Sequence, residues 1–355
     1  MSLPLNQIIQ GDCVNVLATL PDNSVDLIFA DPPYNMQLQQ DLFRPNLTKV
    51  DAVDDAWDQF TDFAEYDAFT RAWLSACRRV LKPEGTLWVI GTYHNIYRVG
   101  AILMDLGYWI INDTLWIKSN PTPNFRGVRF TNAHETLIWA KKDAKARYTF
   151  NYHTMKRMNG GKQMRSDWHL PICNGAERIR VNGLKAHSTQ KPEALLERVI
   201  LSSSQPGAVV LDPFFGTGTT GAVAKRLGRQ WIGIEREPDY IRVATDRIAA
   251  VSTEEAAVEP DTEGRNAPRV PFRRLLDEGL LGLGQVLVFD RDEEYIAFIQ
   301  PEGKVQYKDR RGSIHQIGKL ITGAPCNGWE RWFYTNERGE LAPIDAARGL
   351  RVGQR

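Results

Sequence analysis

The residues best suited to chemistry are Asp31-Pro32-Pro33-Tyr34, which directly follow the apolar run LIFA. Proline has no N–H group, so the carbonyl groups of two successive prolines must point elsewhere than into a strand ladder. A carboxylate beside such a carbonyl offers two hydrogen-bond acceptors to an amino group, and the aromatic ring that follows can stack on a flat base. The tetrapeptide therefore predicts a site for an amino group on a planar heterocycle.

Such an amino group, as in adenine, is a poor nucleophile because its lone pair is delocalised into the ring. If the Asp31 carboxylate and the Pro32 carbonyl accept its two hydrogens, they localise the lone pair and orient it towards an electrophilic methyl group. Positive charge grows on the nitrogen in the transition state, so both acceptors bind more tightly there than in the ground state. We therefore expect Asp31, Pro32, Pro33 and Tyr34 to be catalytic.

A second motif, LDPFFGTGTTG at residues 211–221, joins a strand end to a glycine-rich turn and a helix start. Gly216 and Gly218 allow a tight turn and a close approach of the backbone to a ligand. A P-loop is excluded, because two threonines follow the last glycine where that loop needs Lys and then Ser or Thr. The next predicted strand ends roughly 20 residues on, at Glu235, where a carboxylate can accept both hydroxyls of a ribose. The motif predicts a nucleoside site.

Together the two motifs resemble those of DNA amino-methyltransferases in the β arrangement, where the DPPY segment comes first and the cofactor loop last. The resemblance covers about residues 6–250. It implies an α/β fold with a Rossmann-like, circularly permuted sheet, and S-adenosylmethionine as the cofactor. It also implies that Asp12 meets the cofactor adenine and that Ser188 and Lys191, in HSTQKP, lie near its methionine part. From the residues alone, HSTQKP is equally an N-cap with Pro192 in the first turn.

The cofactor-binding residues expected from the spacing and the resemblance together are Asp12, Ser188, Lys191, Asp212, Phe214, Gly216, Gly218, Thr219, Thr220 and Glu235.

A narrower resemblance concerns the acceptor. Asp rather than Ser at position 31 resembles the adenine-N6 members more than the cytosine-N4 members, although the two groups overlap. The segments DNSVDLIFADPPYN, Asp55-Ala56-Trp57-Asp58 and NAHET at 132–136 resemble the cell-cycle-regulated adenine methyltransferases of alphaproteobacteria, which modify adenine in GANTC. This resemblance implies a homodimer on double-stranded DNA and a cytoplasmic, nucleoid-associated bacterial protein.

Charge is distributed unevenly along the chain. Residues 1–117 carry 7 Lys or Arg and 15 Asp or Glu, whereas residues 118–191 carry 15 and 4, a net charge of +11. A concentrated positive field of this kind is typical of a surface that faces phosphates, and a solvated basic face is the alternative. The residues expected to bind DNA are Arg126, Arg129, Lys156, Arg157, Lys162, Arg165, Arg178 and Arg180.

The elements that must position these residues follow from periodicity. Strands are expected at 27–31, 86–90, 114–118, 136–140, 209–212 and 231–234, and helices at 66–81, 192–203, 219–227 and 240–250. We expect Pro83 and Gly85 to end the first helix. No apolar run approaches the roughly 18 residues of a membrane span, and we expect no signal peptide because the N-terminal residues lack its basic region and long apolar core. The four cysteines form no CxxC pair, which predicts buried thiols and no metal site.

The predicted organisation is a catalytic domain at residues 1–251, with a target-recognition region at about 118–187 inserted within it. Residues 252–271 contain three prolines and few apolar side chains, which is typical of a linker. Residues 272–355 are expected to form a small mixed domain that binds DNA or has another accessory role, with Trp332 and Phe333 in its core.

Some alternatives remain open at this stage. The predicted reaction is methyl transfer to adenine N6 by base flipping and direct in-line displacement. Cytosine-N4 or RNA amino methylation, and a non-catalytic DNA-binding regulator with a methylase fold, are the rival functions. Trp57 is a base-stacking or a packing residue, and His134 and Glu135 border either the target pocket or a strand edge.

Overall fold

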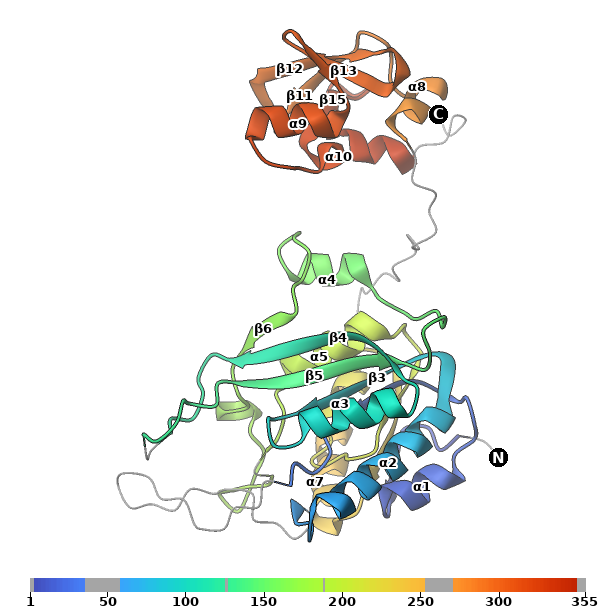
Figure 1. The fold of residues 1–355 in the computed structure, drawn as a ribbon, viewed down its shortest axis with the longest axis vertical. Coiled ribbons are helices and arrows are strands. Elements are labelled where there is room, and N and C mark those ends of the chain that lie inside the picture. The colour runs from blue at the N-terminus through green and yellow to red at the C-terminus, as the bar shows by residue number, and fades with distance from the viewer. Residues whose placement is uncertain (1–2, 36–57, 125–126, 188, 253–270, 350–355) are drawn as a thin grey trace. The chain divides into compact units, whose positions relative to one another are not determined.

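The computed structural model describes residues 3–35, 58–124, 127–187, 189–252 and 271–349. It divides into two compact units, Met1–Thr262 and Glu263–Arg355 (Figure 1). The predicted linker at 252–271 lies, apart from its two end residues, outside the described residues. Trp57, with most of the acidic loop around it, also lies outside them.

A mixed eight-stranded sheet forms the centre of the first unit. In spatial order its strands are β1 (Gln7–Gln10), β10 (Gln230–Glu235), β9 (Val209–Asp212), β2 (Val25–Ala30), β3 (Leu81–Gly91), β5 (His134–Lys141), β4 (Trp109–Lys118) and β6 (Asp167–Leu170). Within this sheet β5 alone runs antiparallel to its neighbours β3 and β4, and the other described pairs are parallel. The chain order therefore places the β9–β10 half after the β2–β3 half, as the β arrangement requires.

Helices cover both faces of this sheet, which is the expected solution for a parallel sheet. One face packs against α1 (Cys13–Thr19), α2 (Phe63–Val80) and α3 (Ile96–Asp105), which lie together in Figure 1. The other face packs against α4 (Tyr152–Met158), α5 (Glu193–Ser203), α6 (Thr219–Arg226) and α7 (Pro238–Ala249). Along β2, Ile28 and Ala30 enter the first core while Leu27 and Phe29 enter the second, because strand side chains alternate. No helix among the described residues is long and apolar enough to cross a membrane.

The strands predicted in the first half of the sequence are present as β2, β3, β4 and β5, and the last three are longer than predicted. Periodicity did not predict β1, α1 or α3. The four residues of β1 are held by pairing with β10, more than 200 residues away along the chain, a contact that no local pattern can indicate.

The helix predicted at 66–81 is confirmed as α2, which begins three residues earlier and ends one residue earlier than predicted. Asp62 caps the start of the helix by accepting a hydrogen bond from the Glu65 backbone N–H at 2.8 Å. The helix ends at Val80, before the predicted stop at Pro83 and Gly85, and β3 begins at once at Leu81. The residue before a proline is disfavoured in helical conformation, so the chain becomes extended ahead of the proline itself.

The second unit has an antiparallel sheet and its own core. The sheet order is β14 (Arg310–Gly312), β13 (Lys304–Tyr307), β12 (Asp292–Gln300), β11 (Val286–Phe289), β15 (Trp332–Thr335) and β16 (Leu341–Pro343), with helices α8 (Phe272–Asp277), α9 (Ile314–Thr322) and α10 (Gly328–Arg331). Trp332 is fully buried, as predicted. The core prediction for Phe333 is wrong, because this next residue on β15 points to the opposite face, where Arg291 lies 4.9 Å from its ring centroid.

Gly233 provides a test of the packing beneath the glycine-rich turn. A Cβ atom added at this position of β10 would lie 2.5 Å from the ring of Phe215, which stacks on Trp231. We expect Gly233→Ala to lower the free energy of unfolding by about 1–3 kcal/mol, the usual cost of overpacking a core. Urea denaturation measures the change. Gly282→Ala is the matched control, because a Cβ there meets nothing within 4 Å, and equal stability of both variants would contradict this packing.

Candidate active site

Acidic residues gather at the carboxyl ends of four adjacent parallel strands. Asp12 follows β1, Glu235 ends β10, Asp212 ends β9 and Asp31 follows β2. In the register of β2 and β9, Leu27 pairs with Val210 and Ile28 with Leu211, so both strands end at the same edge. Ligands of open α/β sheets bind at this edge, beyond the strand ends.

A cavity of about 340 Å³ opens at this edge. Its walls combine carboxylates with aromatic rings, among them Phe69 and Tyr240 from α2 and α7. The catalytic residues predicted from the sequence all line it, namely Asp31, Pro32, Pro33 and Tyr34. The two sequence motifs, about 180 residues apart in the chain, therefore face one cavity.

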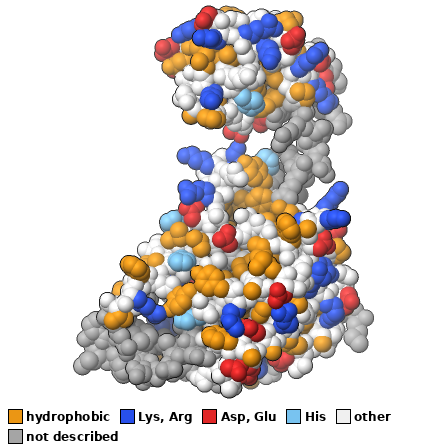
Figure 2. All heavy atoms as spheres, viewed as in Figure 1, with side chains coloured by type: hydrophobic (Ala, Val, Ile, Leu, Met, Phe, Trp, Pro, Cys, Tyr) orange, Lys and Arg blue, Asp and Glu red, His pale blue; other side chains and the backbone are white. Residues whose placement is uncertain are grey.

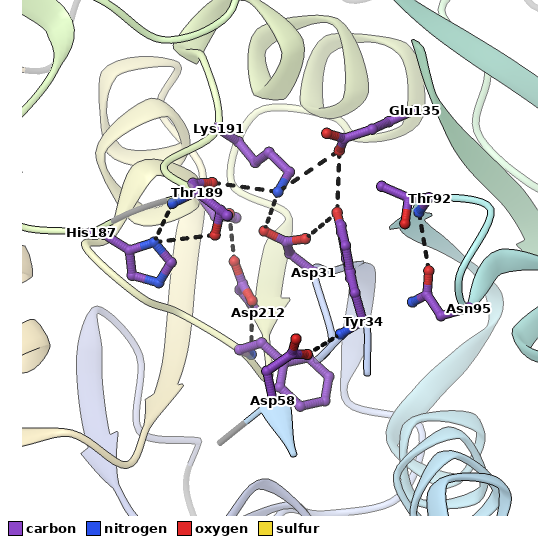
Figure 3. A network of polar contacts seen from close by, with 12 residues as sticks. Asp31, Tyr34, Asp58, Thr92, Asn95, Glu135, His187, Thr189, Lys191 and Asp212 are labelled. Atoms are coloured by element: carbon purple, nitrogen blue, oxygen red, sulfur yellow. Dashed lines mark hydrogen bonds and ion pairs between the residues drawn. The ribbon is translucent and has the colours of Figure 1, made fainter. Parts of the chain in front are cut away.

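Buried polar contacts hold the loop after β2 in place (Figure 3). The Asp58 carboxylate, itself only 3% exposed, accepts hydrogen bonds from the backbone N–H groups of Tyr34 and Asn35. The Tyr66 hydroxyl donates to the Pro33 carbonyl at 3.0 Å. These contacts fix the backbone around the two prolines, so the Asp31 carboxylate has a defined position relative to the cavity.

Both oxygens of the Asp31 carboxylate have a partner. Oδ1 accepts a hydrogen bond from the Tyr34 hydroxyl at 2.9 Å, and Oδ2 lies 2.8 Å from the Lys191 ammonium. The Tyr34 hydroxyl also lies 3.2 Å from Glu135 Oε2, and the Lys191 ammonium lies 3.9 Å from the same oxygen. Lys118 pairs with the other Glu135 oxygen at 2.7 Å. Two acids and two lysines therefore form one compact, mostly buried group, of which Figure 3 shows Asp31, Glu135 and Lys191.

The glycine-rich turn is organised by the Asp212 carboxylate. Its two oxygens accept hydrogen bonds from the Phe214 backbone N–H at 2.9 Å and from the Thr220 hydroxyl at 2.6 Å. The Glu235 carboxylate accepts from the Gly216 backbone N–H at 2.7 Å, which ties the turn to the end of β10. Gly216 and Gly218 both have positive φ, 50° and 76°, as the motif predicted.

Burial dominates the electrostatics of the cavity. It raises the pKa of Asp212 to about 7, although the hydrogen bonds from Thr220 and Phe214 act in the opposite direction. Burial also raises the pKa of Asp31, opposed by the charge of Lys191, and the pKa of Glu235. Carboxylates that are poorly solvated as anions gain from a nearby cation, so the cavity favours a positively charged ligand.

The structure brings together most of the residues expected to bind a cofactor. Those that line the cavity are Asp12, Lys191, Asp212, Phe214, Gly216, Thr219, Thr220 and Glu235. Gly218 packs against α7 instead, where an added Cβ would lie 2.8 Å from Ala244. Ser188 lies outside the described residues.

The residues expected to bind DNA have varied surroundings, and their role stays a prediction. Figure 2 shows Lys and Arg side chains around α4, the helix with Lys156 and Arg157, and a mixture of basic and acidic side chains over α2 and α3. Arg129 lies over the exposed ring of Tyr93, whereas Arg178 donates to the backbone carbonyls of Cys173 and His187. Lys162, Arg165 and Arg180 lie on exposed segments, and Arg126 lies outside the described residues.

Sequence reasoning did not assign the residues that support Asp31. Asp58 is one of several acids in a short stretch, and the sequence gives no sign that it is the buried one. Lys118 ends β4 and Glu135 lies near the start of β5, and the pairing of these strands brings them together. The signal in the sequence is a Glu directly before the apolar run TLIWA, which is compatible with a pocket border and equally with a strand edge.

Comparison with known protein families gives one match, to a family model described as DNA methylase, over residues 25–246. Type II methyltransferase M.HinfI of Haemophilus influenzae is 49% identical over 346 residues, which cover 97% of this chain and 96% of that relative. Type II methyltransferase M2.DpnII of Streptococcus pneumoniae is 43% identical over 245 residues, covering 68% of this chain and 89% of the relative.

Solved structures with a similar fold include the M1.HpyAVI–SAM complex, with a TM-score of 0.51 and 27% sequence identity over 68% of this chain and 98% of that one. The cytosine-N4-specific PvuII DNA methyltransferase has a TM-score of 0.54 at 22% identity, over 72% of this chain and 90% of that one, a likeness of fold alone.

The raised pKa of Asp212 predicts a pH dependence of stability. Because its pKa is raised, this carboxyl holds a proton in the folded chain up to about pH 7, whereas the unfolded chain releases it near the ordinary pKa of 3.8. Stability therefore falls as the pH rises between these values, by on the order of 2 kcal/mol or more. In Asp212→Asn this contribution is absent, so the wild type should lose stability relative to the variant from pH 4 to pH 8.

Chemical denaturation across this pH range measures the difference. Asp105→Asn, at an exposed Asp–Arg contact, is the control and should track the wild type. A wild-type curve parallel to that of Asp212→Asn would refute the raised pKa.

Proposed function

Because this chain belongs to the DNA methylase family, with S-adenosylmethionine as its cofactor, we propose that it methylates the exocyclic N6 amino group of adenine in double-stranded DNA. The observation that carries this proposal is the placement of Asp31 and the Asp212 turn at the ends of neighbouring strands, facing one cavity. An acceptor site for an amino group thereby lies beside a nucleoside-binding turn.

The residues of the cavity fit such a cofactor. When bound, S-adenosylmethionine supplies an electrophilic methyl group on a positively charged sulfur. The buried carboxyl groups of Asp31, Asp212 and Glu235 can offset this positive charge, and a nearby cation would stabilise their ionised forms. Glu235 already accepts three backbone N–H groups, so about one acceptor position of its carboxylate is left for a ribose hydroxyl.

In the proposed reaction, Asp31 and the Pro32 carbonyl accept the two hydrogens of the adenine amino group. The Pro33 carbonyl is occupied by Tyr66, which leaves the Pro32 carbonyl as the second acceptor. These acceptors direct the nitrogen lone pair at the methyl group and stabilise the charge that develops on the nitrogen. Asp31 then takes the proton that the methylated nitrogen releases, a step that its raised pKa favours.

The adenine must leave the base stack to reach Asp31, because its amino group is paired inside the duplex. Extrusion costs a few kcal/mol of free energy, which contacts of the base in the pocket offset. The Tyr34 ring lies beside Asp31, and we assign it the role of stacking on the extruded base. Phosphate contacts of the basic segment 118–191 hold the duplex and make binding salt-dependent.

The recognition sequence in this proposal is GANTC, and the active form is a homodimer associated with the nucleoid. Both statements rest on the resemblance of residues 22–35 and 132–136 to the GANTC-modifying adenine methyltransferases. A role in the cell cycle stays a prediction of the same resemblance, since the relatives found are named Type II methyltransferases.

Asp31→Ala tests the catalytic assignment. We expect the rate of methyl transfer to fall by at least about 10²–10³-fold, the usual loss for one transition-state acceptor, with cofactor and DNA affinities nearly unchanged. Transfer of labelled methyl groups measures the rate, and Asp105→Ala, a surface carboxylate, is the control. Survival of activity in Asp31→Ala would show that this carboxylate is not the acceptor.

The modified base and its sequence context test the substrate. In a random DNA library, we expect the enzyme to methylate adenine at N6 within GANTC. Nucleoside analysis identifies the product and sequencing maps the site. N4-methylcytosine as the sole product would replace the proposed acceptor, and modified adenine outside GANTC would overturn the recognition sequence alone.

The second unit is proposed to contact DNA, since residues 265–355 carry 15 Lys and Arg and residues 271–349 have their own hydrophobic core. Removing residues 272–355 should weaken binding to the recognition sequence by about tenfold or more and reduce the salt dependence. Titration of labelled duplex at several salt concentrations measures both. Unchanged affinity would reject a DNA-binding role for this unit.

A further inference from the structure

The contact between Asp31 and Lys191 raises a question that the proposed reaction does not answer. The adenine amino group needs an oxygen of Asp31, yet Oδ1 accepts the Tyr34 hydroxyl and Oδ2 pairs with the Lys191 ammonium. Lys191 is 6% exposed and Tyr34 8% exposed, so neither partner is a surface group that water readily replaces. The Lys191 ammonium also lies over the Tyr34 ring, 5.2 Å from its centroid, where the extruded base is proposed to stack, so the lysine and the base compete for one place.

Of these two partners, the lysine is the one that can move to another anion, and its other contact is a long one, 3.4 Å from the ammonium to the Thr189 carbonyl. The Tyr34 ring is tied to its loop, because its backbone N–H and that of the next residue both donate to Asp58. The Lys191 ammonium is carried on a flexible four-carbon stem, and a second carboxylate oxygen, Glu135 Oε2, lies only 3.9 Å away. Figure 3 shows the ammonium between the two carboxylates, 5.2 Å from the Tyr34 ring centroid.

We infer that Lys191 occupies the place of the substrate amino group on Asp31 and moves to Glu135 when the adenine enters. Glu135 is then a positioning residue, which acts on the reaction by holding the lysine away from the catalytic carboxylate. This inference rests on the proposed function, because it assumes an amino group as the competing ligand of Asp31.

The charges around the lysine support such an exchange. A buried ammonium needs an anionic partner, and a move from Asp31 to Glu135 keeps one throughout. The pKa of Lys191 is raised by Asp31 and Glu135 against the effect of burial, so the lysine stays charged at neutral pH. The pKa of Glu135 is lowered by Lys191 and Lys118 despite burial, so Glu135 is an anion ready to receive it.

Lys118 makes this arrangement specific. It pairs with Glu135 Oε1 at 2.7 Å, so the other oxygen, Oε2, is the one that faces the Tyr34 hydroxyl at 3.2 Å and the Lys191 ammonium at 3.9 Å. Without the Glu135 carboxylate, Asp31 would be the one remaining anion within 4 Å of the lysine among the described residues. The lysine would then compete with the base for Asp31, and removing the lysine should relieve that competition.

The test is a pair of substitutions and their combination. In Glu135→Gln the single-turnover rate at saturating cofactor should fall about tenfold or more, within the range of coupling between contacting charged residues. Adding Lys191→Met to this variant should recover at least about threefold of the lost rate. Glu135→Asp keeps the charge at shorter reach and should fall between Glu135→Gln and the wild type.

Controls separate this exchange from a structural effect. Lys82→Met removes a Lys–Asp contact of 2.7 Å outside the cavity, similar in length to the 2.8 Å contact of Lys191 with Asp31, and should leave the rate unchanged. Duplex with purine in place of the target adenine lacks the amino group, so Glu135→Gln should bind it as the wild type does. Cofactor affinity and thermal unfolding are measured for every variant.

A rate for Glu135→Gln equal to that of the wild type overturns the inference, and so does a double variant no faster than Glu135→Gln. Failure of the proposed function is distinguishable, because it appears in the wild type as a product other than N6-methyladenine. If Glu135→Gln does not fold, Glu135→Asp takes its place. A single-turnover rate of Glu135→Asp equal to that of the wild type refutes the exchange. A reduced rate that is restored by adding Lys191→Met supports it.

Discussion

The parallel pairing of β2 with β9 is the contact on which the rest of the first unit depends. These strands are separated by more than 170 residues in sequence, yet their register brings Asp31 and Asp212 to the same edge of the sheet. Each strand alternates its side chains between two cores that hold helices on opposite faces. Slipping this pairing by one residue would exchange the two cores, so burial fixes the position of the catalytic loop relative to the cofactor turn.

The site buries several charged groups, which must be neutralised by one another or by a ligand. Asp31, Glu135, Lys118 and Lys191 are nearly balanced in charge, which offsets the large cost of removing each from water. The balance is local, since Asp212 at the same edge has no lysine paired with it among the described residues, and burial raises its pKa to about 7. One end of the cavity is thus neutralised by the protein itself, and the other is left to be neutralised by a cationic ligand.

The catalytic and cofactor motifs can be predicted from the sequence, whereas the residues that surround and support them cannot. The DPPY and glycine-turn segments carry their chemistry locally, so strand, turn and acid were recognisable without the fold. The sequence does not decide the role of Glu135, because that role depends on the pairing of β4 with β5 and on a contact with Tyr34, 101 residues away. β1 was not predicted for the same reason, because its one described strand partner, β10, is more than 200 residues away in the sequence.

The reversed direction of β5 has a consequence for the connection between β4 and β5. Because β5 is antiparallel, the chain leaves the sheet at Lys118 and returns at His134 on the edge where the catalytic loop also emerges. The connection between them is anchored at both ends by strand pairing, with Ile117 opposite His134. A change in the length of this connection therefore leaves the register of the sheet constant, because both of its ends are held by strand pairing.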